Sequence, residues 1–253
     1  DGSFIVFAGG PSGNIWKVRA AEGSTPVQVT DISTDGTKEG GYTPSYLTDG
    51  RIAYYVGWLL DDKSMHIMTA GPSQVKNSPD PSPLITFNGP LVGLGAYAAS
   101  SPGELSVSGG GTRAVGLWQD VYTLDWGTQT AKSVKLSTYI GSASCLMISR
   151  DGGKIAFQSS GDIRWIPFNG NAAILAGKGS YPSWNGDGTL LGYVDETGNN
   201  YVIYNMNTGK TTSYCFQDSG PHQYPVLSWD GKKIVFRRFG TTDSGISVGV
   251  LRD

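Results

Sequence analysis

The chain has 253 residues, a formal net charge of −2 and only 16% charged residues. Its 8 Phe, 7 Trp and 13 Tyr side chains are enough for a large core, which excludes a disordered chain. The near balance of 19 Lys and Arg against 21 Asp and Glu argues against a basic nucleic-acid-binding surface. No run approaches the ~18 consecutive apolar residues of a membrane span.

One short motif recurs along the chain: Asp-Gly, one or two variable residues, and then an apolar run. Its copies begin at residues 1, 49, 110, 151, 187 and 230, and the copy at 110 is degenerate. Asp-Gly favours a tight hairpin turn, because glycine adopts a positive φ at no cost and aspartate hydrogen-bonds its own backbone. The β-branched and aromatic residues that follow predict a strand.

Further strands are expected around each copy. A proline recurs five residues before the Asp, as Pro44, Pro182 and Pro225, and is expected to begin a first strand. A third strand is predicted at 15–18, 65–68, 121–124, 163–166, 201–206 and 246–250. A fourth is predicted at 27–30, 84–87, 133–136, 173–176 and 212–216. Four short antiparallel strands in ~40 residues are typical of a β-propeller blade.

The sequence therefore predicts an all-β fold, a six-bladed β-propeller of four-stranded antiparallel blades, with residues 1–253 as one domain. In this count the first blade lacks its innermost strand and the last blade lacks its fourth. Because a ring gains by closing, segments 1–8 and 245–253 are expected to lie together at the ring closure.

The segments 182–188 (PSWNGDG) and 225–236 (PVLSWDGKKIVF) resemble the TolB-like propeller repeat, a WD-like repeat of the Asp-Gly type. The resemblance covers nearly the whole chain and implies a six-bladed propeller. It does not select a function, because the relatives include periplasmic protein-binding domains, peptidase propeller domains and polysaccharide lyases.

The sequence predicts no catalytic residue, no metal site and no cofactor. His66 and His222 are its only histidines, and the common hydrolase motifs are absent. The lyases among the relatives use several histidines, which this chain lacks. His222 is expected either to line an axial pocket or to bond nearby backbone as a loop residue. The recurring aspartates are interpreted as turn caps rather than metal ligands.

Aromatic residues are the better candidates for ligand binding. Tyr42, Tyr139, Tyr181 and Tyr224 each lie at or just before an innermost strand. Trp58 is expected on an exposed loop with Asp61 and Asp62. Tyrosine and tryptophan stack on sugars and also anchor protein interfaces. Simple packing between blades is the alternative role for the tyrosines.

The first functional hypothesis is a non-catalytic, secreted or periplasmic propeller that binds a glycan, as a lectin does. The alternative is a protein–protein interaction module of the TolB-like type. A second alternative is a hydrolase or lyase with an axial pocket near His222. The expected partner is thus a glycan or a protein and not a nucleic acid. No membrane span is expected in the chain. Cys145 and Cys215 could form one disulfide, but two buried free thiols are the favoured expectation.

Overall fold

The computed structural model describes residues 3–9, 14–30, 38–58, 65–70, 83–87, 104–117, 121–125, 132–135, 143–216, 222–238 and 245–251. The regular structure of these residues is β-strand throughout, which confirms the all-β prediction. They contain no helix long and apolar enough to cross a membrane. The chain divides into two compact units, Asp1–Lys135 and Leu136–Asp253.

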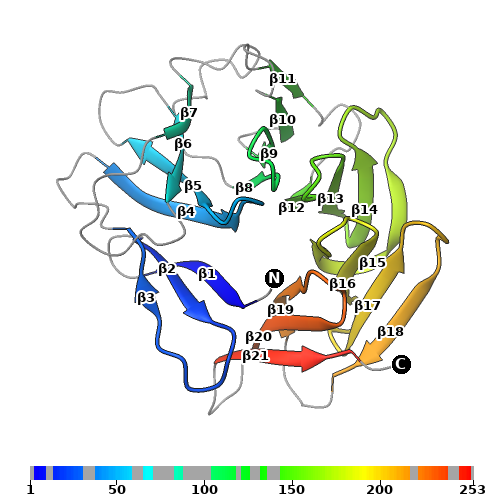
Figure 1. The fold of residues 1–253 in the computed structure, drawn as a ribbon. Coiled ribbons are helices and arrows are strands. Elements are labelled where there is room, and N and C mark those ends of the chain that lie inside the picture. Colours follow the sequence, from blue (N-terminus) through cyan, green and yellow to red (C-terminus); the bar gives the residue numbers. More distant parts are fainter. Residues whose placement is uncertain are drawn as a thin grey trace. The chain divides into compact units, whose positions relative to one another are not determined.

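The first unit contains three antiparallel sheets, whose strands follow one another in chain order (Figure 1). The sheets are β1 (Phe4–Gly9), β2 (Asn14–Arg19) and β3 (Val27–Gln28); β4 (Lys38–Tyr46), β5 (Ile52–Trp58), β6 (Met65–Ala70) and β7 (Pro83–Phe87); and β8 (Glu104–Val107), β9 (Arg113–Leu117), β10 (Val121–Asp125) and β11 (Lys132–Lys135).

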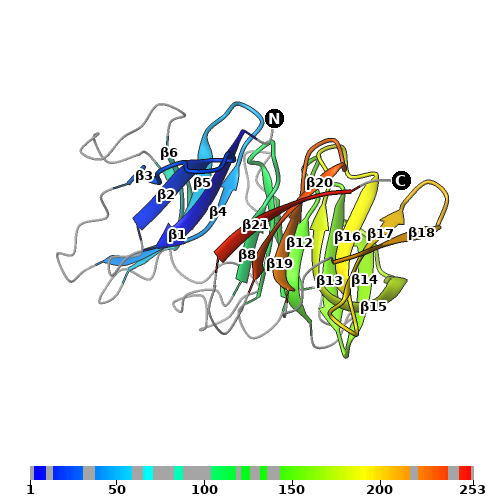
Figure 2. The same ribbon diagram turned by 90° about the horizontal axis from the view of Figure 1, so that it is seen from below.

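The second unit contains a seven-stranded and a three-stranded sheet. The first comprises β12 (Ser144–Ile148), β13 (Lys154–Ser159), β14 (Asp162–Pro167), β15 (Ile174–Trp184), β16 (Leu190–Asp195), β17 (Asn200–Asn205) and β18 (Thr211–Cys215). The second comprises β19 (His222–Leu227), β20 (Lys233–Arg238) and β21 (Gly245–Val250). Figure 2 shows this unit from below, with its strands stacked side by side.

The long strand β15 belongs to two sets of four strands, β12–β15 and β15–β18, and so joins them into one seven-stranded sheet. Its first half pairs with β14, up to Lys178, and its second half pairs with β16 from Gly179 onward. The junction lies at Gly179, which has a φ of 155°. A residue with a side chain rarely adopts this backbone angle. The strand predicted at 173–176 is therefore not separate, because it continues into the first strand of the next set.

The other predicted third and fourth strands each overlap an observed strand, although β3 has only two residues. Within the described residues, the sheets at the two ends of the chain have three strands each. The recurring prolines, in contrast, do not begin strands. Pro44, Pro182 and Pro225 lie inside β4, β15 and β19, beside register shifts where no ladder hydrogen bond is required.

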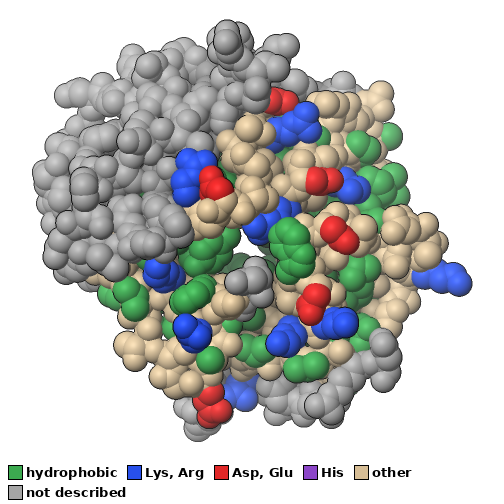
Figure 3. Space-filling model, viewed as in Figure 1, with side chains coloured by type: hydrophobic (Ala, Val, Ile, Leu, Met, Phe, Trp, Pro, Cys, Tyr) green, Lys and Arg blue, Asp and Glu red, His purple; other side chains and the backbone are tan. Residues whose placement is uncertain are grey.

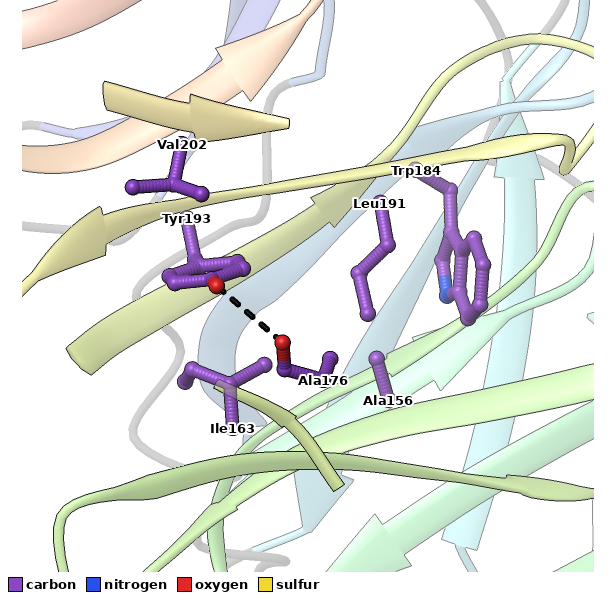
Figure 4. Packing of buried hydrophobic residues seen from close by; sticks show 7 residues of the cluster. All are labelled: Ala156, Ile163, Ala176, Trp184, Leu191, Tyr193 and Val202. Atoms are coloured by element: carbon purple, nitrogen blue, oxygen red, sulfur yellow. Dashed lines mark hydrogen bonds between the residues drawn. The ribbon is translucent and has the colours of Figure 1, made fainter. Parts of the chain in front are cut away.

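Successive sets of strands in the second unit pack face to face. Figure 4 shows Ala156 of β13 and Ile163 of β14 on one side of the cluster, facing Leu191 and Tyr193 of β16. The Tyr193 hydroxyl donates to the carbonyl oxygen of Ala176 at 3.3 Å. The Trp184 indole N–H donates to the carbonyl oxygen of Met147 on β12 at 3.0 Å. These contacts bury large side chains and also satisfy their polar atoms.

The Asp-Gly motifs at residues 49, 151, 187 and 230 form the predicted hairpin turns. In the turn after β15, Asn185 accepts the backbone N–H of Leu190 at 2.9 Å, and Asp187 accepts that of Thr189 at 2.9 Å. Gly188 has a φ of 68°, the left-handed conformation that the turn requires. The aspartates at 49, 151 and 230 accept equivalent backbone bonds. The turn-cap interpretation is confirmed for these four aspartates.

Both cysteines are free, but the prediction that both are buried is wrong. Cys145 is half-buried on β12, whereas Cys215 is exposed. The reason is topological: β18, which carries Cys215, is the outermost strand of the seven-stranded sheet.

Candidate functional site

The first strands of three neighbouring sets in the second unit carry the same β-bulge. The register shifts by one residue between Ser144 and Met147 on β12, between Ser180 and Ser183 on β15, and between Gln223 and Val226 on β19. A bulge bends its strand and re-aims one side chain, and bulges are frequent beside functional sites.

The residue at the start of each bulge is left-handed. The φ values are 53° at Cys145, 57° at Tyr181 and 51° at Tyr224. For a residue with a side chain this conformation costs about 1–2 kcal/mol. Strain of this kind persists where the surrounding structure imposes it, and it is concentrated at functional sites. We refer to Cys145, Tyr181 and Tyr224 as the bulge row.

The side chains of the bulge row are near neighbours. The rings of Tyr181 and Tyr224 have centroids 4.7 Å apart and planes tilted by 52°. Burial raises the pKa of the Tyr181 hydroxyl, and the nearby Tyr224 and Cys145 raise this pKa further. Tyr224 is nevertheless 58% exposed. The row therefore combines an aromatic pair with an accessible surface.

His222 is close to the bulge row in sequence but is buried. Its ring stacks on Phe216 with centroids 3.7 Å apart, and it lies edge-on to Phe236 at 5.1 Å. Its Nδ1 is 3.3 Å from the carbonyl oxygen of Gly198. This environment corresponds to the interpretation of His222 as a residue bonded to nearby backbone. Its involvement in ligand binding stays a prediction.

The other predicted site residues belong to the first unit or lie outside the described residues. Tyr42 is on β4 opposite Tyr55. Trp58 is the last residue of β5, paired with Lys38, and is therefore not on a loop as expected. Asp61, Asp62 and Tyr139 fall outside the described residues. The structure thus brings together Tyr181 and Tyr224, with His222 two residues from Tyr224.

The register places Tyr42 on the first strand of its sheet, but one position before the bulged residue. The shift on β4 lies between Tyr42 and Ser45, so Thr43, rather than Tyr42, corresponds to Tyr181. The reasoning from sequence missed Cys145 altogether. A usable signal was present, because Thr43, Cys145, Tyr181 and Tyr224 each precede the Asp of an Asp-Gly motif by six residues.

The described residues do not contain a group of three or more His, Cys, Asp or Glu side chains that could hold a metal ion. The acidic segment from Asp195 is instead a self-contained turn. Asp195 accepts hydrogen bonds from the Thr197 hydroxyl at 2.8 Å and from the Asn200 side chain at 2.8 Å. In Figure 3, acidic and basic side chains of the described residues are interspersed on the visible face.

Comparison with solved structures places the chain among β-propellers. It superposes on TolB from Acinetobacter baumannii with a TM-score of 0.63 and 16% identity, over 98% of this chain and 60% of that one. The chain thus spans less than two thirds of that TolB. It also superposes on a chain of the nidogen/laminin complex with a TM-score of 0.62 and 13% identity, over 97% of this chain and 88% of that one.

A third similar structure is an oligogalacturonate lyase in complex with manganese. Its TM-score is 0.57 at 14% identity, over 98% of this chain and 71% of the lyase. No protein-family model and no curated protein matches the sequence. At these identities the comparisons show the fold, and they confirm the resemblance to TolB-like propellers at that level.

Proposed function

We propose that the chain is a protein-binding β-propeller module that holds its partner with the bulge row. The observation that carries this proposal is the tilted aromatic pair of Tyr181 and Tyr224, both left-handed and part of one repeated bulge. Aromatic residues held rigidly at a surface are typical anchors of protein interfaces, because they bury a large area at little cost in side-chain entropy.

The strand β19 and the turn after it extend this surface. Tyr224 is 58%, Val226 53% and Trp229 48% exposed. Three large exposed apolar side chains thus lie within six residues, and exposed apolar groupings commonly mark contact sites. The Trp229 ring is also fixed in place, since the Arg150 guanidinium lies 4.5 Å above it.

The comparisons favour this function over the glycan-binding hypothesis. One similar propeller was solved within a complex of two proteins, nidogen and laminin, and another is TolB. No observation among the described residues specifically favours a lectin. One similar structure is a lyase in complex with manganese, but the described residues of this chain contain no cluster of side chains that could hold a metal ion. A secreted or periplasmic location belongs to the same proposal.

The test is a binding experiment with the full chain as bait in an extract of its source. We expect one protein to be retained by the wild type and by Tyr224→Phe but lost with Tyr224→Ala and Tyr181→Ala. Leu175→Ala is the matched control, because Leu175 is also exposed, at 52%, but lies on the other half of β15. Retention that does not depend on either tyrosine contradicts the proposal. So does binding only to a glycan array.

We further infer that the chain is a single six-bladed ring, closed between the first and last sheets. Ile246 is 58% exposed, whereas its register equivalents Ile163 and Tyr201 are 0% exposed because the next set of strands covers them. In the first sheet Ile5 and Phe7 are half-buried, and their equivalents Leu191 and Tyr193 are buried. Each unit therefore has a partly uncovered apolar face that the ring closure would bury.

A double-mutant cycle between Phe7→Ala and Ile246→Ala tests the closure by urea unfolding. Residues in contact show a coupling of about 0.5 kcal/mol or more, and distant residues show additive effects. Additivity within error contradicts the closure, and with it the count of six blades.

A further inference from the structure

His222 ties the start of β19 to the preceding set of strands, β15–β18. Its Nδ1 is 3.3 Å from the carbonyl oxygen of Gly198, which lies in the turn between β16 and β17. A carbonyl oxygen can only accept a hydrogen bond, so Nδ1 carries the hydrogen and donates it. His222 is therefore a donor that reaches from β19 into the neighbouring sheet.

The imidazole ring of His222 has little freedom to move. The side chain is 4% exposed, and its ring stacks on Phe216 with centroids 3.7 Å apart and planes 8° apart. Phe236 lies edge-on to the ring at 5.1 Å. A side chain that is held both by packing and by a hydrogen bond fixes the position of the backbone that carries it.

The turn that presents the Gly198 carbonyl oxygen is itself held by one carboxylate. Asp195 accepts the backbone N–H groups of the two residues after Gly198, both at 3.2 Å. Asp195 also lies opposite Gly179 on β15, two residues before Tyr181. The turn therefore has a defined place beside the strand that carries Tyr181.

The contact lies close to the bulge on β19. Tyr224 follows His222 by two residues, and the register between β19 and β20 shifts between Gln223 and Val226. Pairing with β20 therefore does not by itself set the place of Tyr224. The distance of 4.7 Å between its ring and that of Tyr181 depends also on how β19 is tied to the preceding strands.

We propose that His222 is a positioning residue of the bulge row: its bond to Gly198 sets where Tyr224 lies against Tyr181, and so how tightly a partner protein is held. The consequence for binding rests on the function proposed above, whereas the positioning does not. An anchor that is already fixed binds more tightly than a mobile one, because less conformational freedom is lost when the partner binds.

Two substitutions at His222 separate the hydrogen bond from the packing. His222→Phe keeps a flat ring that can stack on Phe216 but removes the N–H donor. His222→Asn loses the ring but can place an amide N–H where Nδ1 lies. Because it removes buried ring atoms, asparagine should be the less stable variant in urea unfolding. The proposal predicts the opposite order for the position of Tyr224, whereas a merely structural role predicts the same order for both.

The tyrosine ring resonances of the full chain report this position without any partner. Rings 4.7 Å apart shift each other's NMR signals through ring currents, and the variants Tyr181→Phe and Tyr224→Phe assign the two signals. We expect both signals to keep their wild-type shifts in His222→Asn and to move in His222→Phe. Unchanged signals in His222→Phe, or equal movement in both variants, overturn the proposal.

The turn supplies an independent variant. Asp195→Ala releases the turn that presents the Gly198 carbonyl oxygen, so it should move the same two signals as His222→Phe. The double variant should move them no further, because the two residues act through one contact. Asn205→Ala is the matched control, since Asn205 accepts backbone N–H groups in the turn between β17 and β18. Movement in the control, or additive movement in the double variant, overturns the proposal.

Binding is measured with the full chain as bait in an extract of its source. His222→Phe should hold the protein that the wild type retains roughly tenfold more weakly, and His222→Asn should hold it almost as tightly as the wild type. If the ring signals move as expected but the wild type retains no protein, the proposed function is wrong and the positioning stands. If a protein is retained equally by the wild type and both variants, the position of Tyr224 does not govern binding and the inference is wrong.

Discussion

Ser183 and Tyr201 share a hydrogen bond in the interior of the second unit, with their hydroxyl oxygens 3.0 Å apart. The Ser183 hydroxyl also accepts the backbone N–H of Leu227 on β19 at 3.2 Å. The two side chains are 1% and 0% exposed, so neither hydroxyl can be satisfied by bulk water. One serine therefore joins β15, β17 and β19.

Ser183→Ala is expected to destabilise the protein by about 1–3 kcal/mol, because it leaves the Tyr201 hydroxyl and the Leu227 N–H buried without this partner. Urea unfolding measures the loss. Ser213→Ala on β18 is the matched control, since Ser213 is exposed. A loss no larger than that of Ser213→Ala would mean that the hydrogen bond contributes nothing.

Gly186→Ala is expected to destabilise the turn after β15. A Cβ at Gly186 would overlap the indole ring of Trp229, and the N–H of Gly186 donates to the Trp229 carbonyl oxygen at 3.0 Å. Overpacking of this kind costs about 1–3 kcal/mol. Thermal unfolding compares it with Gly245→Ala, where a Cβ meets nothing within 4 Å. Equal melting temperatures for the two variants contradict the prediction.

Acid is expected to destabilise the Asp-Gly turns. The Thr189 hydroxyl and backbone N–H hold the pKa of Asp187 below its ordinary value of 3.8, and the Ser228 hydroxyl, followed by the Lys232 N–H, does the same for Asp230. A folded-state pKa below the unfolded value stabilises the protein above the unfolded pKa. This contribution is lost as the pH falls through the folded value.

The variant Asp187→Asn tests this dependence. Asparagine can still accept the Thr189 backbone N–H but does not titrate, so the variant should fold at neutral pH and lose less stability between pH ~4 and ~2. Melting temperatures across that range measure the effect. Asp162→Asn is a control that keeps the Asp-Gly turns intact. An acid limb identical to that of the wild type would show that Asp187 does not contribute.

Most of the strand order could be predicted from the sequence, because the information is local. Each Asp-Gly motif fixes a turn, and the apolar runs after Asp151, Asp187 and Asp230 can only be strands. The continuity of β15 could not be predicted. It depends on Gly179 bending one strand between two partners, and the sequence around it has the same composition as a loop.

The candidate site was predicted less completely, for a different reason. Tyr181 and Tyr224 were found because they are aromatic and close to a first strand. Cys145 was missed, because a bulge shifts the register by one residue without changing composition. The bulged residue lies six residues before the Asp of the following Asp-Gly motif. Its position can therefore be found from this spacing but not from residue type alone.

The bulge row should show a trade between stability and binding. Tyr224 has a φ of 51°, which glycine adopts without strain and alanine does not. Tyr224→Gly is therefore expected to be more stable than Tyr224→Ala, by roughly 1 kcal/mol in urea unfolding. Both variants lose the ring that packs against Tyr181, so both should lose the partner that the wild type is proposed to retain.

The matched pair at Gln223 separates strain from general tolerance. Gln223 precedes Tyr224 on β19 and pairs with Arg237, without the left-handed backbone. There the order should reverse, and Gln223→Gly should be less stable than Gln223→Ala because glycine weakens a strand interior. If glycine is the less stable substitution at Tyr224 as well, the bulge stores no strain. The tyrosine would then be held there by packing against Tyr181 alone.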